Sequence, residues 1–340
     1  MYANCCNMPE NMNDNLENVL VTAVVTTYNR FQMAQCAIRS VLVQTYKPLE
    51  IIVVEDGSDS GIKAWLKKKE LNNVHYIRHE ENKGLAVARN TGLMLAKGEY
   101  IAYLDDDDEW KPECIEKRIG ILKSLSPNYR KHLGVVYCGC EIHIIHERRI
   151  TYNMPKIQGN IMECIRNQGL STIPSACLFP RKILQEICGF DENLCSSVDH
   201  DIWMKLAVEG CYALVVNEAL VITFHTKRKK SMTADTDLRI CGVEQYLEKW
   251  KSIYKEWYGL DGERRFMRRY RTKVLGRLAG QKLIEGAIGE VWHLVRHVIK
   301  QNAYSLFDYA LFVALIAFPL IRWIIPDKIV SMMKKSKILK

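Results

Sequence analysis

The first third of the 340-residue chain alternates short, continuous apolar runs with segments of helical periodicity. The apolar runs are rich in β-branched residues and predict buried strands at 20–26, 51–54, 74–77 and 100–104. The segments between them predict helices at about 31–44, 61–70 and 84–96. Continuous apolar strands are typical of sheets that are covered on both faces. The pattern therefore predicts an α/β fold with a mostly parallel sheet flanked by helices.

Polar residues follow three of these predicted strands, at Asn29-Arg30, at Asp56 to Ser58 and at Asp105 to Asp108. Ligands of open parallel sheets bind beyond the carboxyl ends of the strands, so we expect these residues to line one crevice. Four consecutive aspartates raise each other's pKa unless a cation lies among them. Their hard oxygens suit Mg²⁺ or Mn²⁺ shared with substrate phosphates. A solvated acidic loop is the alternative for the cluster taken alone.

The composition is that of a folded globular chain, with 48% hydrophobic and 26% charged residues. Twelve scattered cysteines include no paired C-x-x-C motif, so we expect reduced thiols and no zinc site. The net charge of +9 is uneven, with basic clusters at 227–230 and 264–271. Such clusters suit a nucleic acid, an anionic membrane or an anionic substrate, or are simply solvated. The interleaved aromatic and basic residues of a nucleic-acid module are missing, so no nucleic-acid partner is expected.

The chain divides by composition into four predicted segments. Residues 1–18 are polar, lack the apolar core of a signal peptide and predict a loose N-terminal extension. Residues 19–225 carry the α/β pattern, which continues with strands expected at 133–137 and 141–146. Residues 226–300 predict basic amphipathic helices, and residues 301–340 form a hydrophobic and basic tail.

The tail contains the most hydrophobic stretch of the chain, residues 309–321, followed by Trp323 and five lysines. A spanning helix needs about 20 apolar residues, and Pro319 and Arg322 interrupt this stretch. We therefore expect a membrane-associating helix that lies in the cytoplasmic leaflet, with the lysines on lipid phosphates. A core helix or an oligomer contact is the alternative. The expected location is cytoplasmic, peripheral or monotopic at the inner face of the cell membrane.

Five sequence blocks occur in order, at 24–30 (VVTTYNR), 40–46 (SVLVQTY), 50–58 (EIIVVEDGS), 82–90 (NKGLAVARN) and 98–108 (GEYIAYLDDDD). Together they resemble the family 2 glycosyltransferases with the GT-A fold, a Rossmann-like α/β architecture, over roughly residues 19–225. The resemblance implies inverting transfer of a sugar from a nucleotide sugar, most often a UDP-sugar. It also implies assistance by a divalent metal, Mn²⁺ or Mg²⁺.

The resemblance further implies a nucleotide site. Carried over by position, Thr26, Tyr28 and Asp56 would hold the nucleotide base, with Asp56 accepting a hydrogen bond from the uracil ring. The segment from Lys83 to Arg89 would border the nucleotide pocket. Glu55 replaces the first Asp of the family's usual pattern, a departure that leaves Asp56 in place. The full set of implied nucleotide-binding residues is Thr26, Tyr28, Arg30, Asp56, Lys83, Arg89, Asp105 and Asp106.

The same resemblance assigns the metal site and the catalytic base. Asp105 to Asp107 would be the D-x-D segment, with Asp107 as the direct metal ligand and Asp105 near the ribose or the metal. His225 would contact the metal or a phosphate, unless it is a structural histidine. The segment 198–205 resembles the family's catalytic segment and places Asp199 as the base. Asp201 is the alternative, because residues two apart on a helix do not face the same way, and Asp199 could also cap that helix.

The chemistry supports these roles independently of the resemblance. A divalent cation stabilises the charge that grows on a nucleoside diphosphate leaving group. A carboxylate on the opposite face then deprotonates the acceptor hydroxyl. We therefore expect a glycosyltransferase that builds a surface polysaccharide or glycan on a glycan or lipid-linked acceptor. The rival hypotheses are a nucleotidyltransferase, which would carry a Gly-rich loop after the first strand, and a non-catalytic nucleotide-sugar-binding protein, which would lack Asp107 or Asp199.

Overall fold

The computed structural model describes residues 18–300 except 124, 156, 169–171 and 226–234, together with the isolated residues Val313 and Ile316. The predicted N-terminal extension, apart from Asn18, and the predicted tail, apart from those two residues, lie outside the described part. Contacts divide the chain into two compact units. The sheet unit comprises Met1–Glu192 and Val198–Lys227, and the helical unit comprises Asn193–Ser197 and Arg228–Lys340.

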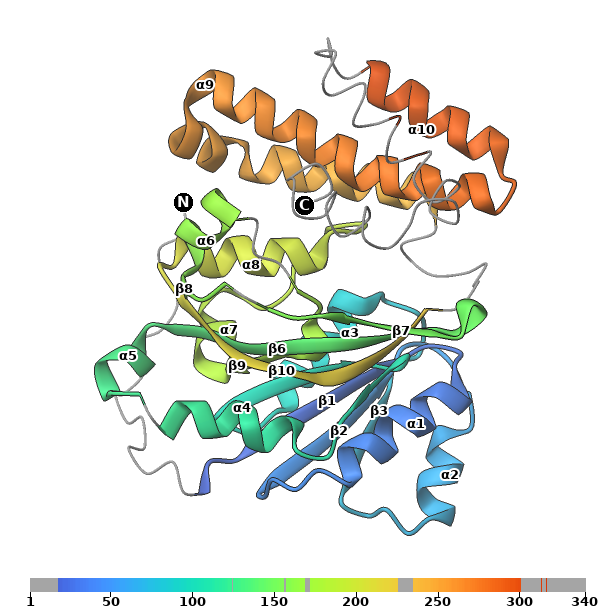
Figure 1. Cartoon of the computed structure of the whole chain (residues 1–340). Helices are drawn as coiled ribbons and strands as arrows, with labels where there is room; N and C mark the ends of the chain where they lie inside the picture. The colour runs from blue at the N-terminus through green and yellow to red at the C-terminus, as the bar shows by residue number, and fades with distance from the viewer. Residues whose placement is uncertain are drawn as a thin grey trace. The chain divides into compact units, whose positions relative to one another are not determined.

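The first half of the sheet is parallel, as the sequence predicts (Figure 1). Its strands, in spatial order, are β3 (Val74–Arg78), β2 (Leu49–Glu55), β1 (Val21–Thr27) and β4 (Tyr100–Asp105). The connecting helices are α1 (Phe31–Leu42), α2 (Ile62–Lys68) and α3 (Leu85–Leu95). Parallel pairing sets Thr26 between Val54 and Asp105. The carboxyl ends of β1, β2 and β4 therefore meet at one edge of the sheet.

Helices cover both faces of these strands, which explains why every residue of β1 is buried. Alternate β1 residues, beginning with Val21, share one core cluster with side chains of α1, α2 and α4 (Cys114–Lys123). The other face carries α3, whose Gly92 lies against Val24. A Cβ at Gly92 would come within 2.3 Å of the Val24 side chain, so only glycine allows this close approach of helix and strand.

The second half of the sheet is mixed, so the prediction of a mostly parallel sheet holds only in part. β9 (Cys177–Pro180) runs antiparallel to both β4 and β6 (Leu133–Ile144), whereas β6 runs parallel to β10 (Tyr212–His225). The separate strands expected at 133–137 and 141–146 are wrong, because β6 continues through Gly139. The missing Cβ at Gly139 leaves room for the Glu218 carbonyl oxygen, which would lie 3.0 Å from it.

Short elements complete the sheet unit. The strands β5 (Asp108–Trp110) and β8 (Gly159–Asn160) pair antiparallel with β10, and β7 (Arg149–Asn153) pairs antiparallel with β6. The remaining helices of the unit are α5 (Pro127–Lys131), α6 (Ile161–Gln168), α7 (Arg181–Glu186), α8 (Val198–Val208) and the 3₁₀ turns η2 (Ile145–Glu147) and η3 (Pro174–Ala176). Of these, η3 and α8 bring residues to the candidate site.

The helical unit consists of α9 (Thr236–Ile284) and α10 (Ile288–Lys300). Gly259 has a φ of 70°, and the two arms of α9 fold back on each other there. The rings of Tyr254 and Phe266, one on each arm, lie 4.1 Å apart between centroids. The helix α10 buries Val291, Leu294 and Val298. Among the described residues, no helix is both long enough and apolar enough to cross a membrane.

Candidate functional site

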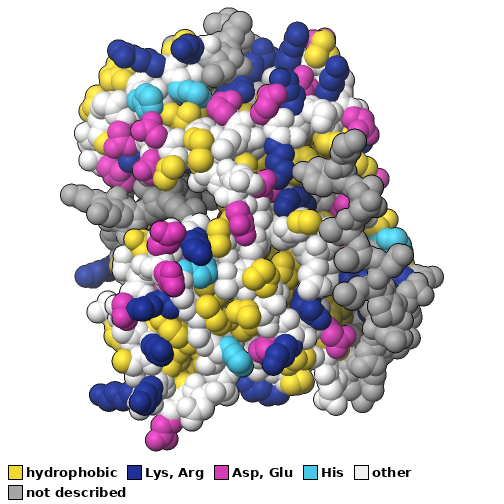
Figure 2. Space-filling view, turned by 180° about the vertical axis from the view of Figure 1, so that it is seen from behind, with side chains coloured by type: hydrophobic (Ala, Val, Ile, Leu, Met, Phe, Trp, Pro, Cys, Tyr) yellow, Lys and Arg dark blue, Asp and Glu magenta, His cyan; other side chains and the backbone are white. Residues whose placement is uncertain are grey.

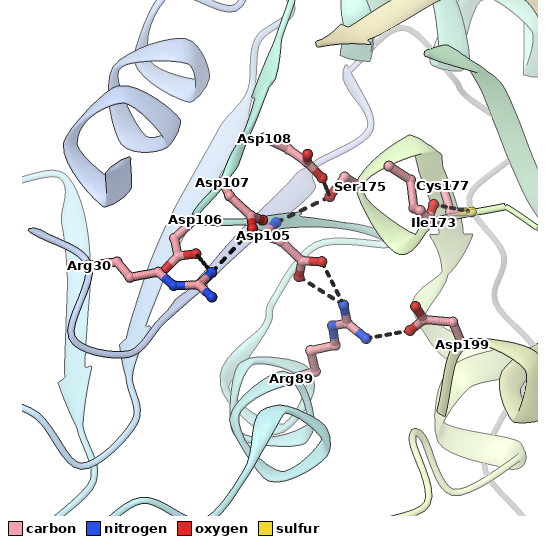
Figure 3. Close-up of polar contacts among 10 residues, drawn as sticks. All are labelled: Arg30, Arg89, Asp105, Asp106, Asp107, Asp108, Ile173, Ser175, Cys177 and Asp199. Carbon is pink, nitrogen blue, oxygen red and sulfur yellow. Dashed lines mark hydrogen bonds and ion pairs between the residues drawn. The ribbon is translucent and has the colours of Figure 1, made fainter. Parts of the chain in front are cut away.

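The four aspartates lie where β4 turns into β5 (Figure 3). Asp105 ends β4 and Asp108 begins β5, so the tight connection sends successive side chains in different directions. Oxygens of Asp105, Asp107 and Asp108 all lie within 4.8 Å of one another. Three hard carboxylate oxygens at this spacing form a donor set suited to Mg²⁺ or Mn²⁺. The carboxylates therefore fit the divalent metal that the sequence resemblance implies.

The cluster is not a solvated loop, because Asp106 and Asp108 are buried. Burial raises the pKa of Asp106 to about 6, although Arg30 and Thr27 act against this shift. Burial also raises the pKa of Asp108 well above its usual range, with a further contribution from the charge on Asp105. Arg30 bonds to Asp106 at 2.9 Å and to Asp107 at 3.2 Å. The charge of Arg30 thus offsets part of the repulsion among these carboxylates, and a bound cation would offset the rest.

Ser175 fixes the backbone and the last aspartate of this turn. Its hydroxyl donates to Asp108 Oδ2 at 2.6 Å and accepts from the Asp105 backbone N–H at 3.2 Å. The carbonyl of Ser175 accepts from the indole N–H of Trp110 at 2.7 Å. These three bonds hold the turn from both sides. Nothing in the local sequence links Ser175 to Asp108, which lies 67 residues away along the chain.

The two candidate bases have different surroundings. Asp199, in the first turn of α8, has a side chain that is 43% exposed, and its Oδ1 accepts from Arg89 at 2.8 Å. Asp201 has a side chain that is 0% exposed and lies 3.9 Å from Lys205. Arg89 also bonds both oxygens of Asp105, so Asp199 belongs to the same contact network as the acidic cluster. Exposure and this network favour Asp199 over Asp201.

Asp56 holds a neighbouring loop rather than facing solvent. Its carboxylate accepts from the backbone N–H groups of Lys83 at 2.9 Å and of Gly84 at 2.8 Å. His79 Nδ1 lies 2.7 Å from Asp56, and His79 Nε2 lies 2.9 Å from the hydroxyl of Thr91. The side chain of His79 was not singled out from the sequence. The structure thus ties the block 82–90 to the end of β2, while leaving the base contact implied for Asp56 a prediction.

The other implied nucleotide residues lie at the same sheet edge. Thr26 is buried in β1 beside Asp105, and Tyr28, just after the strand, is 44% exposed. His225 ends β10, two residues beyond Thr223, which pairs with Asp108 in β5. Among the described residues, His225 does not belong to the group formed by Asp105, Asp107 and Asp108, whose oxygens lie within 4.8 Å of one another. Its role as a ligand therefore stays a prediction.

Glu55, the departure from the family pattern, is explained by its contacts. Its carboxylate accepts from the hydroxyl of Ser58 at 2.7 Å, the N–H of Ser60 at 2.8 Å and the hydroxyl of Tyr76 at 2.6 Å. Burial acts to raise the pKa of Glu55, but the hydrogen bonds outweigh it and the pKa is lowered. The ionised carboxylate therefore stabilises the turn that follows β2.

Glu55→Gln is expected to lower the free energy of unfolding by about 1–3 kcal/mol at pH 7, because it weakens buried charge-assisted hydrogen bonds. A pKa lowered by folding contributes stability above the unfolded pKa, and that contribution is lost as the pH falls. The difference between wild type and variant should therefore shrink as the pH falls below about 4.3, the ordinary pKa of Glu. Urea unfolding at pH 7 and pH 4 measures it, with the exposed Glu80→Gln as control. An equal difference at both pH values would contradict this role.

Comparisons with known proteins agree with this geometry. The profile described as Glycosyl transferase family 2 matches residues 22–188. TuaG of Bacillus subtilis, a glycosyltransferase provisionally assigned to teichuronic acid biosynthesis, is 37% identical over 245 residues, which cover 70% of this chain and 86% of TuaG. The chain belongs to glycosyltransferase family 2. WcaA of Escherichia coli, provisionally assigned to colanic acid biosynthesis, is another relative, 28% identical over 239 residues that cover 70% of this chain and 83% of WcaA.

Two solved structures share the fold of this family 2 glycosyltransferase. TarS 1–349 of S. aureus, in complex with UDP-GlcNAc, aligns with a TM-score of 0.54 and 17% identity over 82% of this chain and 90% of that one. The mannosyltransferase PcManGT of Pyrobaculum calidifontis, in complex with GDP-Man and Mn²⁺, aligns with a TM-score of 0.53 and 17% identity over 92% and 84%. The architecture is that of GT-A glycosyltransferases, as the sequence predicts. Against one Rickettsia bellii glycosyltransferase, the chain covers only 27% of the relative's length.

Proposed function

We propose that this glycosyltransferase moves a sugar, with inversion, from a nucleotide sugar to an acceptor hydroxyl, and that Asp199 is the base. The observation that carries the proposal is the network in which Arg89 joins the half-exposed Asp199 to Asp105 of the acidic cluster. One end of this network suits a nucleoside diphosphate with its cation, and the other suits an acceptor hydroxyl. A base on one side and a leaving group on the other are the two requirements of a single displacement.

The donor is proposed to be a UDP-sugar. TarS binds UDP-GlcNAc and PcManGT binds GDP-Man, which supports a nucleotide-sugar donor for a chain of the same fold. In this chain the exposed ring of Tyr28 and the loop held by Asp56 border the sheet edge where the nucleotide base would lie. Arg30, beside Asp106 and Asp107, would face the diphosphate.

A divalent cation, Mn²⁺ or Mg²⁺, is proposed at Asp105, Asp107 and Asp108, with His225 as a further candidate ligand. The spacing of the three carboxylates and the burial of Asp108, which raises its pKa, support it. When bound, the cation acts as a Lewis acid on the diphosphate leaving group. The carboxylates contribute by holding charge at the end of β4, where the turn is fixed by Ser175.

The acceptor side depends on Asp199. Its carboxylate would accept the proton of the acceptor hydroxyl as the oxygen attacks the anomeric carbon from the face opposite the diphosphate. The proton ends on Asp199, the bond to the diphosphate breaks, and the new glycosidic bond has the inverted configuration. Because attack and departure occur on opposite faces, one base suffices and no covalent sugar intermediate on the protein is required.

The proposal is tested by incubating the full chain with UDP-, GDP- and dTDP-sugars in Mn²⁺, Mg²⁺ or EDTA, and measuring the released products. Metal-dependent release of nucleoside diphosphate is expected from one donor class. Release of pyrophosphate from a nucleoside triphosphate and a sugar phosphate would favour the nucleotidyltransferase instead. Thermal stabilisation by a nucleotide sugar without turnover, with glycan and lipid-linked acceptors supplied, would favour the non-catalytic binding protein.

The product is proposed to be a surface polysaccharide or related glycan, built on a glycan or lipid-linked acceptor. The provisional assignments of TuaG and WcaA to polysaccharide biosynthesis support this role. The charge distribution supports an acceptor at a membrane. Residues 226–340 contain 24 Lys and Arg against 11 Asp and Glu, a net charge of +13 in a chain whose total is +9. The basic third of the chain would therefore favour an anionic surface.

The described part of the helical unit offers a surface for that contact. Trp292 is 60% exposed, and Ile288 and Ile299 on the same side of α10 are also exposed. Their spacing places them on one stripe of the helix, beside the buried stripe of Val291 and Leu294. Figure 2 shows Lys and Arg side chains, in dark blue, interspersed with Asp and Glu, in magenta, over the helices of this unit. Trp with basic neighbours is typical of helices at the membrane interface. We place this contact at the cytoplasmic face of the membrane.

Trp292→Ser is expected to weaken binding to phosphatidylglycerol vesicles roughly tenfold, the effect of keeping one large apolar side chain in water. Co-sedimentation of the full chain with these vesicles and with phosphatidylcholine vesicles measures the affinity. The matched control is Tyr129→Ser, which removes an aromatic ring that is 64% exposed on the sheet unit. Equal binding by both variants and the wild type would exclude α10 as the membrane contact.

A further inference from the structure

Arg89 is enclosed between two carboxylates of the sheet unit (Figure 3). Its Nη1 donates to Asp199 Oδ1 at 2.8 Å, and its Nη2 donates to the two oxygens of Asp105 at 2.8 and 3.0 Å. The side chain is 0% exposed. Both terminal nitrogens thus face carboxylates, and no part of the guanidinium faces solvent. These contacts do not test the nucleotide-binding role that the sequence resemblance implies for Arg89, which stays a prediction.

The surroundings hold the guanidinium in place. The ring of Phe190 lies 5.0 Å from the guanidinium carbon of Arg89, a cation–π distance. Phe190 is itself fixed, because its N–H donates to Asn90 Oδ1 at 2.9 Å and its carbonyl accepts from Asn90 Nδ2 at 2.8 Å. Two neighbouring residues of α3 therefore act together: Arg89 supplies the cation, and Asn90 holds Phe190 against it.

Burying the charged guanidinium of Arg89 costs free energy that an apolar side chain at this position would not cost. The Nε of Arg89 is buried and has no hydrogen-bond partner among the described residues, and a buried charge loses its hydration. Burial acts to lower the pKa of Arg89, but Asp105 and Asp199 outweigh it and raise the pKa, so the side chain stays charged. A buried ion pair of this kind is weak support for stability. Its location in the candidate site points to a functional reason.

We propose that Arg89 is a positioning residue that orients the base Asp199 and ties it to Asp105 at the donor end of the site. The inference rests on the proposed function, because it requires Asp199 to be the base. Bonding by Arg89 fixes Oδ1 of Asp199, and Oδ2 makes no hydrogen bond within the described residues. The second oxygen is therefore the one turned to the acceptor hydroxyl, and its direction follows from the planar guanidinium.

Arg89 also balances the charges that this arrangement brings together. Asp105 and Asp199 are both acidic, and each would disfavour ionisation of the other without a cation between them. A planar guanidinium can bond both carboxylates at once, whereas the compact ammonium of a lysine cannot reproduce that bridge. Arg89→Lys therefore keeps the positive charge but loses the bridge that orients Asp199.

The test is a double-mutant cycle with Arg89→Lys, Asp199→Asn and the double variant, in which transfer to acceptor and affinity for UDP are measured. Arg89→Lys is expected to lower kcat about 10- to 100-fold, the usual effect of misplacing a reacting group. The KM for the donor and the affinity for UDP should change less than about twofold, because the nucleotide is not the partner. In the Asp199→Asn background, Arg89→Lys should lower kcat less than about threefold further. Arg39→Lys, on the exposed side of α1, is the control.

Three results would overturn the proposal. A loss of UDP affinity of more than about tenfold would make Arg89 a nucleotide ligand. Independent, additive effects of the two substitutions on kcat would separate Arg89 from the base. A lowered melting temperature, with equal losses of transfer and of donor hydrolysis, would make Arg89 merely structural. Activity of Asp199→Asn equal to wild type would instead contradict the proposed function itself, whatever Arg89→Lys does.

Chemical rescue gives a second readout. Arg89→Ala removes the shared cation and is expected to be less stable, so its activity is compared at a temperature where it remains folded. Added guanidinium ion at non-denaturing concentration should restore transfer several-fold in this variant, because it can occupy the vacated place between the two carboxylates. It should not restore transfer in the double variant with Asp199→Asn. Rescue of both variants, or of neither, would contradict the positioning role.

Discussion

Asp199→Asn is expected to lower the rate of sugar transfer by about 10²- to 10⁴-fold, the usual contribution of a general base. The amide keeps the shape of the side chain but cannot take the proton of the acceptor hydroxyl. Binding of UDP should remain within about twofold of wild type, because Asp199 lies on the far side of Arg89 from the acidic cluster. Transfer is measured by product formation, and binding by titration calorimetry.

Asp201→Asn is the comparison that decides between the two candidate bases. Its side chain is buried and lies near Lys205, so the substitution is expected to reduce stability. The folded protein should nevertheless transfer sugar within about threefold of wild type, since a structural change away from the reacting atoms acts on the folded fraction. The opposite pattern, in which Asp201→Asn abolishes transfer and Asp199→Asn does not, would reassign the base.

Asp107→Ala is expected to lower transfer at least about 100-fold at low metal concentration, with partial recovery as Mn²⁺ or Mg²⁺ is raised. The side chain shares the carboxylate cluster with Asp105 and Asp108, so removing one of the three proposed ligands should weaken binding of the cation proposed to stabilise the leaving group. EDTA should reproduce the loss in the wild type. Rates measured across a metal titration give the apparent metal affinity of each protein.

Glu109→Gln is the matched control for the metal prediction. Glu109 directly follows the aspartates in sequence but is not part of the carboxylate group at metal spacing. The control should titrate with metal as the wild type does. A wild-type metal response in Asp107→Ala, or insensitivity of the wild type to EDTA, would remove the cation from the proposed site.

Local signals in the sequence account for the part of the fold that was predicted. The runs that form β1 to β4 are apolar and β-branched, and each is followed by a turn or a helical pattern. β1 pairs with β2 and β2 with β3, as their order in the sequence suggests, whereas β4 pairs with β1 on the other side. The position of the aspartates at the end of β4 follows from the same logic. The second half of the sheet depends on distant pairings, such as β4 with β9, that no local pattern encodes.

The same distinction separates the predicted site residues from those that were missed. Ser175 and His79 act through partners far along the chain or on another strand, and neither lies in a motif. Arg89 was identified from its block, but a helix of small residues does not reveal that its side chain turns inward to Asp199. The sequence thus predicted which residue types the site contains, whereas the hydrogen-bond partners of these residues could be identified only from the folded structure.

The configuration of the first sugar released distinguishes a single displacement with inversion from a reaction that retains configuration. In the absence of acceptor, water takes the acceptor's place, so the first sugar released from an α-linked nucleotide sugar can be followed by proton NMR before it mutarotates. For a single displacement we expect the β anomer to be released first, and Asp199→Asn to slow this release. Initial release of the α anomer would exclude a single displacement, because retention requires a second displacement that one base does not provide.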